Sequence, residues 1–144
     1  MSELFFFDHK HAEIVHDNII SISGGLHGYN KKPQDVQGII EFIKHNDYYP
    51  TFEDKITHLV FSINKNHIYT DGNKRTSIAL GAYFLEINGY DYCADSFIKG
   101  MENIAVSLAN NKISKELLRK IITSIINEPE FSELLKLEII NATK

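Results

Sequence analysis

Apolar residues recur at every third or fourth position along most of the chain, which is the pattern of helices with one buried face. The pattern is interrupted by Gly24 and Gly25, by Pro50, by residues 64–66 and by Asn88–Gly89. Residues of these types commonly end helices or separate them. The spacing therefore predicts helices over about residues 7–22, 33–46, 51–64, 71–87, 95–108, 114–127 and 129–140.

The segment from Asp71 to Ile87 differs from the others because it is apolar on nearly all sides. A helix of that kind is buried by its neighbours, so we predict that it is the central helix. Strand signals are weak, and the Asp47–Phe52 bend and the Tyr90–Cys93 stretch are the candidates for a short hairpin or an extended piece. We therefore expect an all-α array of antiparallel helices that forms a single domain over residues 1–144.

Composition narrows the class of protein. Hydrophobic residues make up 43% of the chain and charged residues 24%, which predicts a folded domain. The net charge of -4 gives no broad cationic field, so nucleic acid is not expected as the main partner. The single cysteine, Cys93, has no partner for an internal disulfide, and the Leu4–Phe7 run is too short for a signal peptide. No stretch has the length of a membrane span, so we expect a soluble cytoplasmic protein.

The most concentrated set of reactive side chains lies in residues 66–76, where a loop enters the predicted central helix. The first turn of a helix offers backbone N–H groups without intrahelical partners and the positive end of the helix dipole, so it can bind phosphate. Gly72 lets a ligand approach the backbone closely. Asn73 adds neutral donors, while Lys74 and Arg75 add cationic ones. Two adjacent cations at this end of a helix suggest an anionic partner, and we predict that residues 72–75 bind a nucleotide phosphate chain.

Two further residues complete the predicted chemistry. Asp71 next to a phosphate site is unfavourable unless a cation separates the two, and magnesium commonly binds carboxylates together with phosphate oxygens. His67 can accept a proton near neutral pH, as the general base for an incoming hydroxyl must. Hydrogen-bond donors for phosphate, a carboxylate for a metal ion and a base together predict phosphoryl or nucleotidyl transfer. Taken singly, each residue has a simpler explanation: His67 as a satisfied or solvated histidine, Asp71 as an N-cap, Gly72 as a turn residue and the two cations as a solvated helix face.

The stretch HIYTDGNKR resembles the signature His-x-Phe-x-(Asp/Glu)-Gly-Asn-(Gly/Lys)-Arg of the Fic and death-on-curing (Doc) superfamily. The resemblance implies a helical fold whose loop and helix start hold the phosphates of ATP. By position it implies that His67 is the base, that Asp71 binds Mg²⁺, and that Asn73 and Arg75 bind phosphate.

Two departures from the Fic pattern place the chain closer to the death-on-curing branch, and a third is a mild change. Lys74 stands where adenylyl-transferring Fic proteins have glycine, and Ile78 stands where they have a second arginine. Tyr69 replaces the phenylalanine of the pattern and keeps an aromatic anchor. The toxins of that branch move the terminal phosphate of ATP to a threonine of elongation factor Tu and are controlled by a separate antitoxin, so the resemblance implies these partners here.

The resemblance extends over about residues 10–110 and leaves the C-terminal helices, about 113–141, outside it. Ser23–Gly28 looks like the glycine turn of death-on-curing proteins, and Asn88–Gly89 looks like their helix ending. Asp47–Glu53 matches by position the flap that aligns a target peptide in this superfamily. Ser124–Glu128 has part of the spacing of an inhibitory Fic helix, but Pro129 follows it and Ile78 removes the arginine it would pair with, so we do not expect self-inhibition.

Alternatives to a toxin kinase remain at this point. The chain is alternatively a Fic-type adenylyltransferase of a protein hydroxyl, or a catalytically silent module that kept the fold. The aromatic run Phe5–Phe7 is expected to be core or the contact of a homo-oligomer. The remaining histidines share no metal spacing and are expected to be surface or packing groups; they are His9, His11, His16, His27, His45 and His58.

Overall fold

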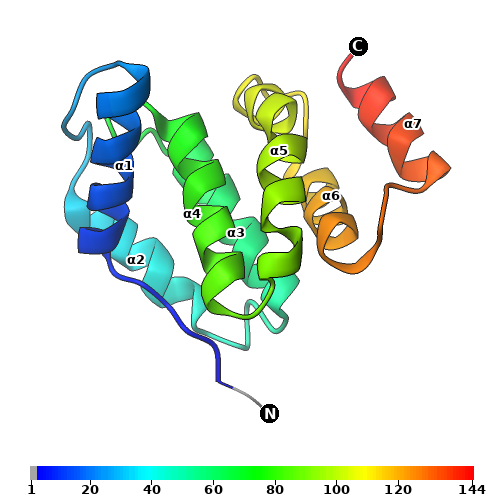
Figure 1. Ribbon diagram of the computed structural model, residues 1–144, viewed down its shortest axis with the longest axis horizontal. Coiled ribbons are helices and arrows are strands. Elements are labelled where there is room, and N and C mark those ends of the chain that lie inside the picture. Colours follow the sequence, from blue (N-terminus) through cyan, green and yellow to red (C-terminus); the bar gives the residue numbers. More distant parts are fainter. Residues whose placement is uncertain (1–2) are drawn as a thin grey trace.

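The computed structural model describes residues 3–144, and its regular structure is helical (Figure 1). The helices are α1 (His9–Ser23), α2 (Pro33–Ile43), α3 (Phe52–Lys65), α4 (Asn73–Ile87), the 3-10 helix η1 (Asp91–Cys93), α5 (Ala94–Ala109), α6 (Lys115–Asn127) and α7 (Glu133–Ala142). Within residues 3–144 no strand forms, and one isolated antiparallel bridge joins Tyr29 to Tyr69. The prediction of an all-α fold is confirmed.

Helix starts follow the expected local chemistry at several places. Pro33 is the first residue of α2, where its missing N–H costs no hydrogen bond. The Thr51 hydroxyl accepts from the Asp54 N–H at 3.1 Å, and the Asp54 carboxylate accepts from the Thr51 N–H, so the predicted capping box before α3 is confirmed. The predicted start of the last helix was wrong. α7 begins at Glu133 because the Ser132 hydroxyl accepts from Leu135 N–H at 3.1 Å, and Pro129 lies in the loop before it.

Neither candidate for extended structure forms a strand. Residues 47–51 form a turn and an irregular loop before α3, which begins at Phe52. The Tyr90–Cys93 stretch winds into η1, which runs directly into α5. α5 therefore begins at Ala94, and Asp95 lies in its first turn instead of capping it. α2 also ends at Ile43, three residues before the predicted end.

The central position of α4 is confirmed. It lies between α1 and α5, with α3 behind it in Figure 1, and it contacts all three. Its fully buried side chains include Leu80, Phe84 and Leu85. Gly81 lets α3 and α5 approach closely, since a Cβ there would lie 2.8 Å from the Phe97 ring and 2.9 Å from Val60. The helix that begins at the motif is thus fixed on three sides.

The two ends of the chain differ in how they join this core. Phe6 and Phe7 pack against it, with Phe6 5.6 Å from the Phe84 ring, whereas Phe5 is exposed. α7 lies at the edge of the molecule, where it contacts α6 (Figure 1). Within residues 3–144, no helix combines the length and the apolar character that crossing a bilayer requires.

Candidate active site

The motif, residues 67–75, forms most of the loop between α3 and α4 and the first turn of α4. The loop is anchored by Ile68 and Tyr69, which are buried, while His67 at its start is exposed. His67 has a φ of 50°, and Asn111 is the other non-glycine residue between 3 and 144 with a positive φ. A left-handed conformation costs a residue with a Cβ on the order of 1 kcal/mol, so the fold holds His67 in place against a local preference.

Asn73 closes the loop on itself. Its side-chain oxygen accepts from the Tyr69 N–H at 3.1 Å, and its side-chain nitrogen donates to the Tyr69 carbonyl at 2.9 Å. One side chain thereby satisfies both polar groups of a buried residue four positions earlier. The predicted phosphate ligand thus has a structural role, with one amide hydrogen left for another acceptor.

The glycine turn between α1 and α2 lies directly against the motif. Leu26 N–H donates to Asp71 Oδ2 at 3.0 Å, and Thr70 N–H donates to the Gly28 carbonyl at 3.0 Å. Arg75 donates to the Ser23 hydroxyl and, at 3.3 Å, to the Gly24 carbonyl. The Ser23–Gly28 turn, which resembles the glycine turn of death-on-curing proteins, therefore holds Asp71 and Arg75 of the motif in place.

His16 is a site residue that its sequence position did not reveal. It lies on the buried face of α1 with Ala12 and Ile20, and its Nε2 is 2.6 Å from the Asp71 carbonyl oxygen. Its ring stacks on Tyr69, with centroids 4.0 Å apart and planes 9° apart. The signal was present, since residues 12, 16 and 20 share one helix face. A polar side chain on that face needs a buried partner, but the sequence does not show which one.

The fold requires glycine at position 72, in addition to any advantage for ligand binding. Gly72 occupies the N-cap position of α4 with a φ of 79°, a conformation that glycine adopts without a Cβ penalty. A Cβ at this residue would also lie 2.9 Å from Cδ1 of Ile20. Asp71 precedes the cap, so the alternative in which Asp71 caps α4 is wrong.

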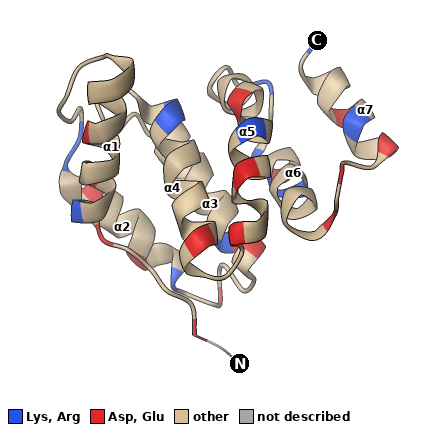
Figure 2. Ribbon diagram, in the orientation of Figure 1, with Lys and Arg blue, Asp and Glu red and all other residues tan. Residues whose placement is uncertain are grey.

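The first turn of α4 leaves donors available. The first α4 amide with a backbone acceptor belongs to Thr76, which donates to the Gly72 carbonyl at 2.8 Å, and nothing in residues 3–144 accepts from the N–H groups of residues 72–75. The Lys74 side chain is exposed and forms no hydrogen bond or ion pair within the described chain. Figure 2 shows the cationic start of α4, which carries Lys74 and Arg75 at the positive end of the helix dipole.

Asp71 offers limited capacity for a metal. It is half-buried, and one carboxylate oxygen accepts from Leu26 while the other has no hydrogen-bond partner in residues 3–144. No group of three or more His, Cys, Asp or Glu side chains in the described chain is arranged to hold a metal ion. Asp71 therefore fits a magnesium ion that takes its remaining ligands from phosphate and water.

A cavity of about 660 Å³ between α2 and α3 reaches the loop on both sides of His67, because Asn66 and Ile68 form part of its wall. His58 lines the same cavity. Burial, together with the ammonium of Lys115 2.7 Å away, lowers the pKa of His58 to about 4. A histidine with such a pKa is neutral and weakly basic at pH 7, so His58 does not compete with His67 as a general base.

The segment predicted as a flap lies elsewhere. Residues 47–53 run into the first turn of α3 and the motif follows its last turn, so most of this 14-residue helix, about 21 Å long in all, separates the two. The backbone that borders the motif instead belongs to Gly28–Lys31, where Asn30 and Lys31 donate to the Ile68 carbonyl at 2.8 and 3.1 Å. A positional match in sequence did not identify the neighbouring segment, because that neighbour is set by how α1 packs on α4.

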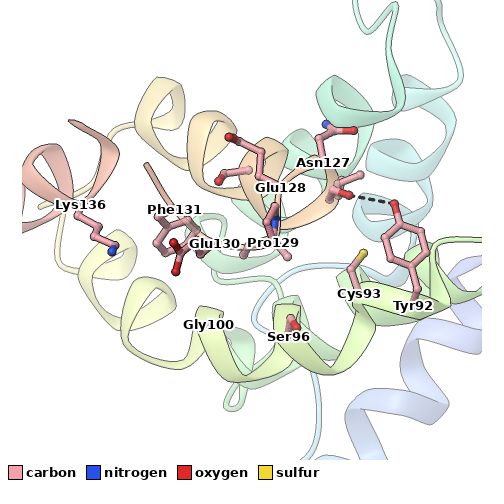
Figure 3. Close-up of a pocket in the computed structure, with 13 residues that line it drawn as sticks. Tyr92, Cys93, Ser96, Gly100, Asn127, Glu128, Pro129, Glu130, Phe131 and Lys136 are labelled. Carbon is pink, nitrogen blue, oxygen red and sulfur yellow. Dashed lines mark hydrogen bonds between the residues drawn. The ribbon is translucent and has the colours of Figure 1, made fainter. Parts of the chain in front are cut away.

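A second cavity lies at the other end of α4. It has a volume of about 560 Å³ and is enclosed by the start of α5, the end of α6 and the loop to α7 (Figure 3). Ser124–Glu128 lines it, and Tyr92 donates to the Ile126 carbonyl at 2.9 Å. Since Tyr92 follows the C-terminal end of α4, residues 76–87 of α4, about 18 Å of helix, separate this stretch from Arg75. This placement agrees with the expectation that Ser124–Glu128 does not inhibit the motif.

The structure thus brings Asp71, Gly72 and Arg75 together against the end of α1 and leaves Lys74 open to solvent. It places His67 on the same loop, exposed and without a hydrogen bond to another motif residue in the described chain. The arrangement places N–H and cationic groups suited to an anion, one carboxylate suited to a metal ion and one exposed imidazole within nine consecutive residues.

Comparison with known proteins gives two results. The model of the Fic/DOC family matches residues 6–85, more than half of the chain and including the whole motif. A protein named Toxin Doc from Mycolicibacterium smegmatis is 40% identical over 63 residues, which are 44% of this chain and 48% of that protein. The match therefore spans about half the length of that relative.

Proposed function

Because this chain belongs to the Fic/DOC family, we propose that it is an ATP-dependent transferase that modifies a protein hydroxyl group. Its active site is the α3–α4 loop with the first turn of α4. The observation that carries the proposal is the cationic start of α4. Lys74 and Arg75 lie beside backbone N–H groups that have no acceptor in the described chain, next to the half-buried Asp71. This local arrangement is unfavourable by itself and becomes favourable when a polyphosphate is bound.

Phosphate binding is distributed over three kinds of donor. The free N–H groups of residues 72–75 supply oriented dipoles, and the Arg75 guanidinium, held at the end of α1 by Ser23 and Gly24, supplies a fixed charge. Lys74 supplies a mobile charge because it has no partner in the described chain. Bound magnesium, with Asp71 as its protein ligand, would neutralise part of the phosphate charge.

His67 is the proposed base. It accepts the proton of the incoming hydroxyl at a ring nitrogen while the hydroxyl oxygen forms a bond to the γ-phosphorus of ATP. The bond from that phosphorus to the β–γ bridging oxygen breaks, and ADP leaves. The cavity beside Asn66 and Ile68 gives an acceptor segment room to reach His67.

Within this class we propose a Doc-like toxin kinase, with a Thr or Ser of a translation factor similar to elongation factor Tu as the acceptor. Lys74 in place of a small residue favours a nucleotide orientation that presents the terminal phosphate, and the partial match to Toxin Doc supports the same branch. That relationship also supports a separate antitoxin protein as the regulator.

The test is transfer of label from ATP carrying radioactive phosphorus at either the α or the γ position, with elongation factor Tu as acceptor. A kinase transfers only the γ label, and mass spectrometry then finds one added phosphate on the target. Transfer of the α label would identify the adenylyltransferase instead. If neither label moves, and no growth arrest occurs in cells that express the chain, the silent interaction module is the better description.

A further inference from the structure

We propose that His16 is a positioning residue that turns the peptide between Asp71 and Gly72, so that the Gly72 N–H faces the phosphates of the nucleotide. The inference rests on the proposed function for its ligand, but the orientation of the peptide is a property of the free protein.

The contact is short and buried. His16 is 1% exposed, and its Nε2 lies 2.6 Å from the Asp71 carbonyl oxygen across 55 residues of sequence. A carbonyl oxygen only accepts hydrogen bonds, so Nε2 carries the hydrogen. Stacking on Tyr69 at 4.0 Å fixes the plane of the ring, and the loop therefore receives the donor in one orientation.

The geometry of a trans peptide carries this orientation to the next N–H. Within residues 3–144 no peptide bond is cis, and in a planar trans peptide the C=O and N–H groups point to opposite sides. The Asp71 carbonyl points inward to His16, so the Gly72 N–H of the same peptide points away from it. No acceptor in the described chain receives that N–H. It is therefore left for water or for an anion at the start of α4.

A purely structural role for His16 makes a different prediction, and His11 on the same helix provides the comparison. His11 also stacks on a tyrosine, Tyr83, at 4.2 Å, but its ring forms no hydrogen bond to the motif. If filling space were the whole role of His16, phenylalanine would preserve the affinity for Mg-ATP, and glutamine, which lacks the ring, would not restore it.

The experiment compares His16→Phe with His11→Phe in the full chain. In the absence of ATP, the ¹⁵N and ¹H shifts of the Gly72 amide should change in His16→Phe and stay as in wild type in His11→Phe. The Kd for Mg-ATP should then rise about tenfold in His16→Phe, the expected size for one lost hydrogen bond in a polar network. His16→Gln, which keeps a side-chain donor, should recover part of that affinity. Thermal unfolding of each variant confirms that the compared proteins are folded.

Two outcomes would overturn the inference: an unchanged Gly72 amide in His16→Phe, or an equal change in both phenylalanine variants. Failure of the proposed function is recognised separately, because wild-type protein would then show no Mg-ATP binding while the Gly72 amide of the free protein still responded to His16→Phe.

Discussion

The two ends of α4 are held by different forces. At its C-terminal end the Phe84 ring lies 5.0 Å from Phe52 and 5.6 Å from Phe6, and Phe52 stacks on Tyr90 at 4.4 Å. At its N-terminal end the contacts are mainly hydrogen bonds, from His16 to the Asp71 carbonyl and from Leu26 to the Asp71 carboxylate. One end is an aromatic cluster, and the other is a polar scaffold.

The C-terminal end of α4 mainly stabilises the fold, whereas the N-terminal end is suited to binding a ligand. Aromatic packing buries large apolar surfaces and contributes to the free energy of unfolding without any demand on charge. The polar end instead contains features that oppose folding: a left-handed His67 and two cations at the positive end of the helix dipole. Features of this kind persist where they serve a ligand, so the functional site is expected at the less stable end.

The largest effect is expected from His67→Asn. Loss of a general base lowers a transfer rate by about 10²–10⁴-fold. Asparagine tolerates a positive φ better than most residues, so the free energy of unfolding should stay the same or rise by up to about 1 kcal/mol. Label transfer from ATP and urea unfolding measure the two effects. His45→Asn, at an exposed histidine outside the motif, serves as the control for stability and should leave the free energy of unfolding unchanged. Retained transfer in His67→Asn would remove His67 from the mechanism.

The opposite result is expected from Phe84→Ala at the other end of α4. Removing a fully buried ring should lower the free energy of unfolding by about 3–5 kcal/mol. Label transfer per folded molecule should remain near that of wild type at a temperature where the variant is folded. Urea unfolding checks the first value, with Phe42→Ala at a 43% exposed ring as the matched control. A loss of transfer in fully folded Phe84→Ala would show that the two ends are coupled.

Gly72→Ala tests whether the backbone conformation at the N-terminal end of α4 requires glycine. The φ of 79° and the predicted approach of Cβ to Ile20 at 2.9 Å should together lower the free energy of unfolding by about 1–3 kcal/mol. Affinity for Mg-ATP should fall as well, because the strain reorients the peptide that carries the Gly72 N–H. Gly38→Ala is the control, because α2 is regular there and a Cβ meets nothing within 4 Å, so this change should stabilise the protein by about 0.5–1 kcal/mol. Equal effects of the two changes would contradict the strain argument.

The sequence was sufficient for the features that depend on neighbouring residues. Helical periodicity, the Thr51–Asp54 capping box and the buried character of α4 were all predicted, because each depends on residues within a few positions of one another. The cluster of motif residues was predictable for the same reason.

Long-range contacts were not predictable in this way. The approach of His16 to Asp71 depends on how α1 packs across α4, and the period of α1 shows only that His16 is buried. The flap prediction failed for the same reason, since residues 47–53 were matched by position and the neighbour of the motif is the α1–α2 turn. Asn73, expected as a phosphate ligand, also proved to brace Tyr69, which only the folded loop reveals.

The smallest effect is expected from Tyr69→Phe, at the centre of the polar end. The Tyr69 side chain is buried and its hydroxyl has no hydrogen-bond partner within residues 3–144, and burial raises the pKa of this phenol above its usual range. Removing an unsatisfied buried hydroxyl should change the free energy of unfolding by less than about 1 kcal/mol, in the stabilising direction, and leave label transfer unchanged. Tyr29→Phe is the matched control, because that hydroxyl donates to Glu13 at 2.6 Å, and its loss should cost about 0.5–1 kcal/mol. Urea unfolding compares the two.

If Tyr69→Phe were the more destabilising change, the Tyr69 phenol would have a partner such as ordered water, and polar contacts would extend beneath the Tyr69 ring. If it is neutral, the ring serves as an apolar base on which His16 orients the loop, and the hydrogen bonds above it account for the shape of the site.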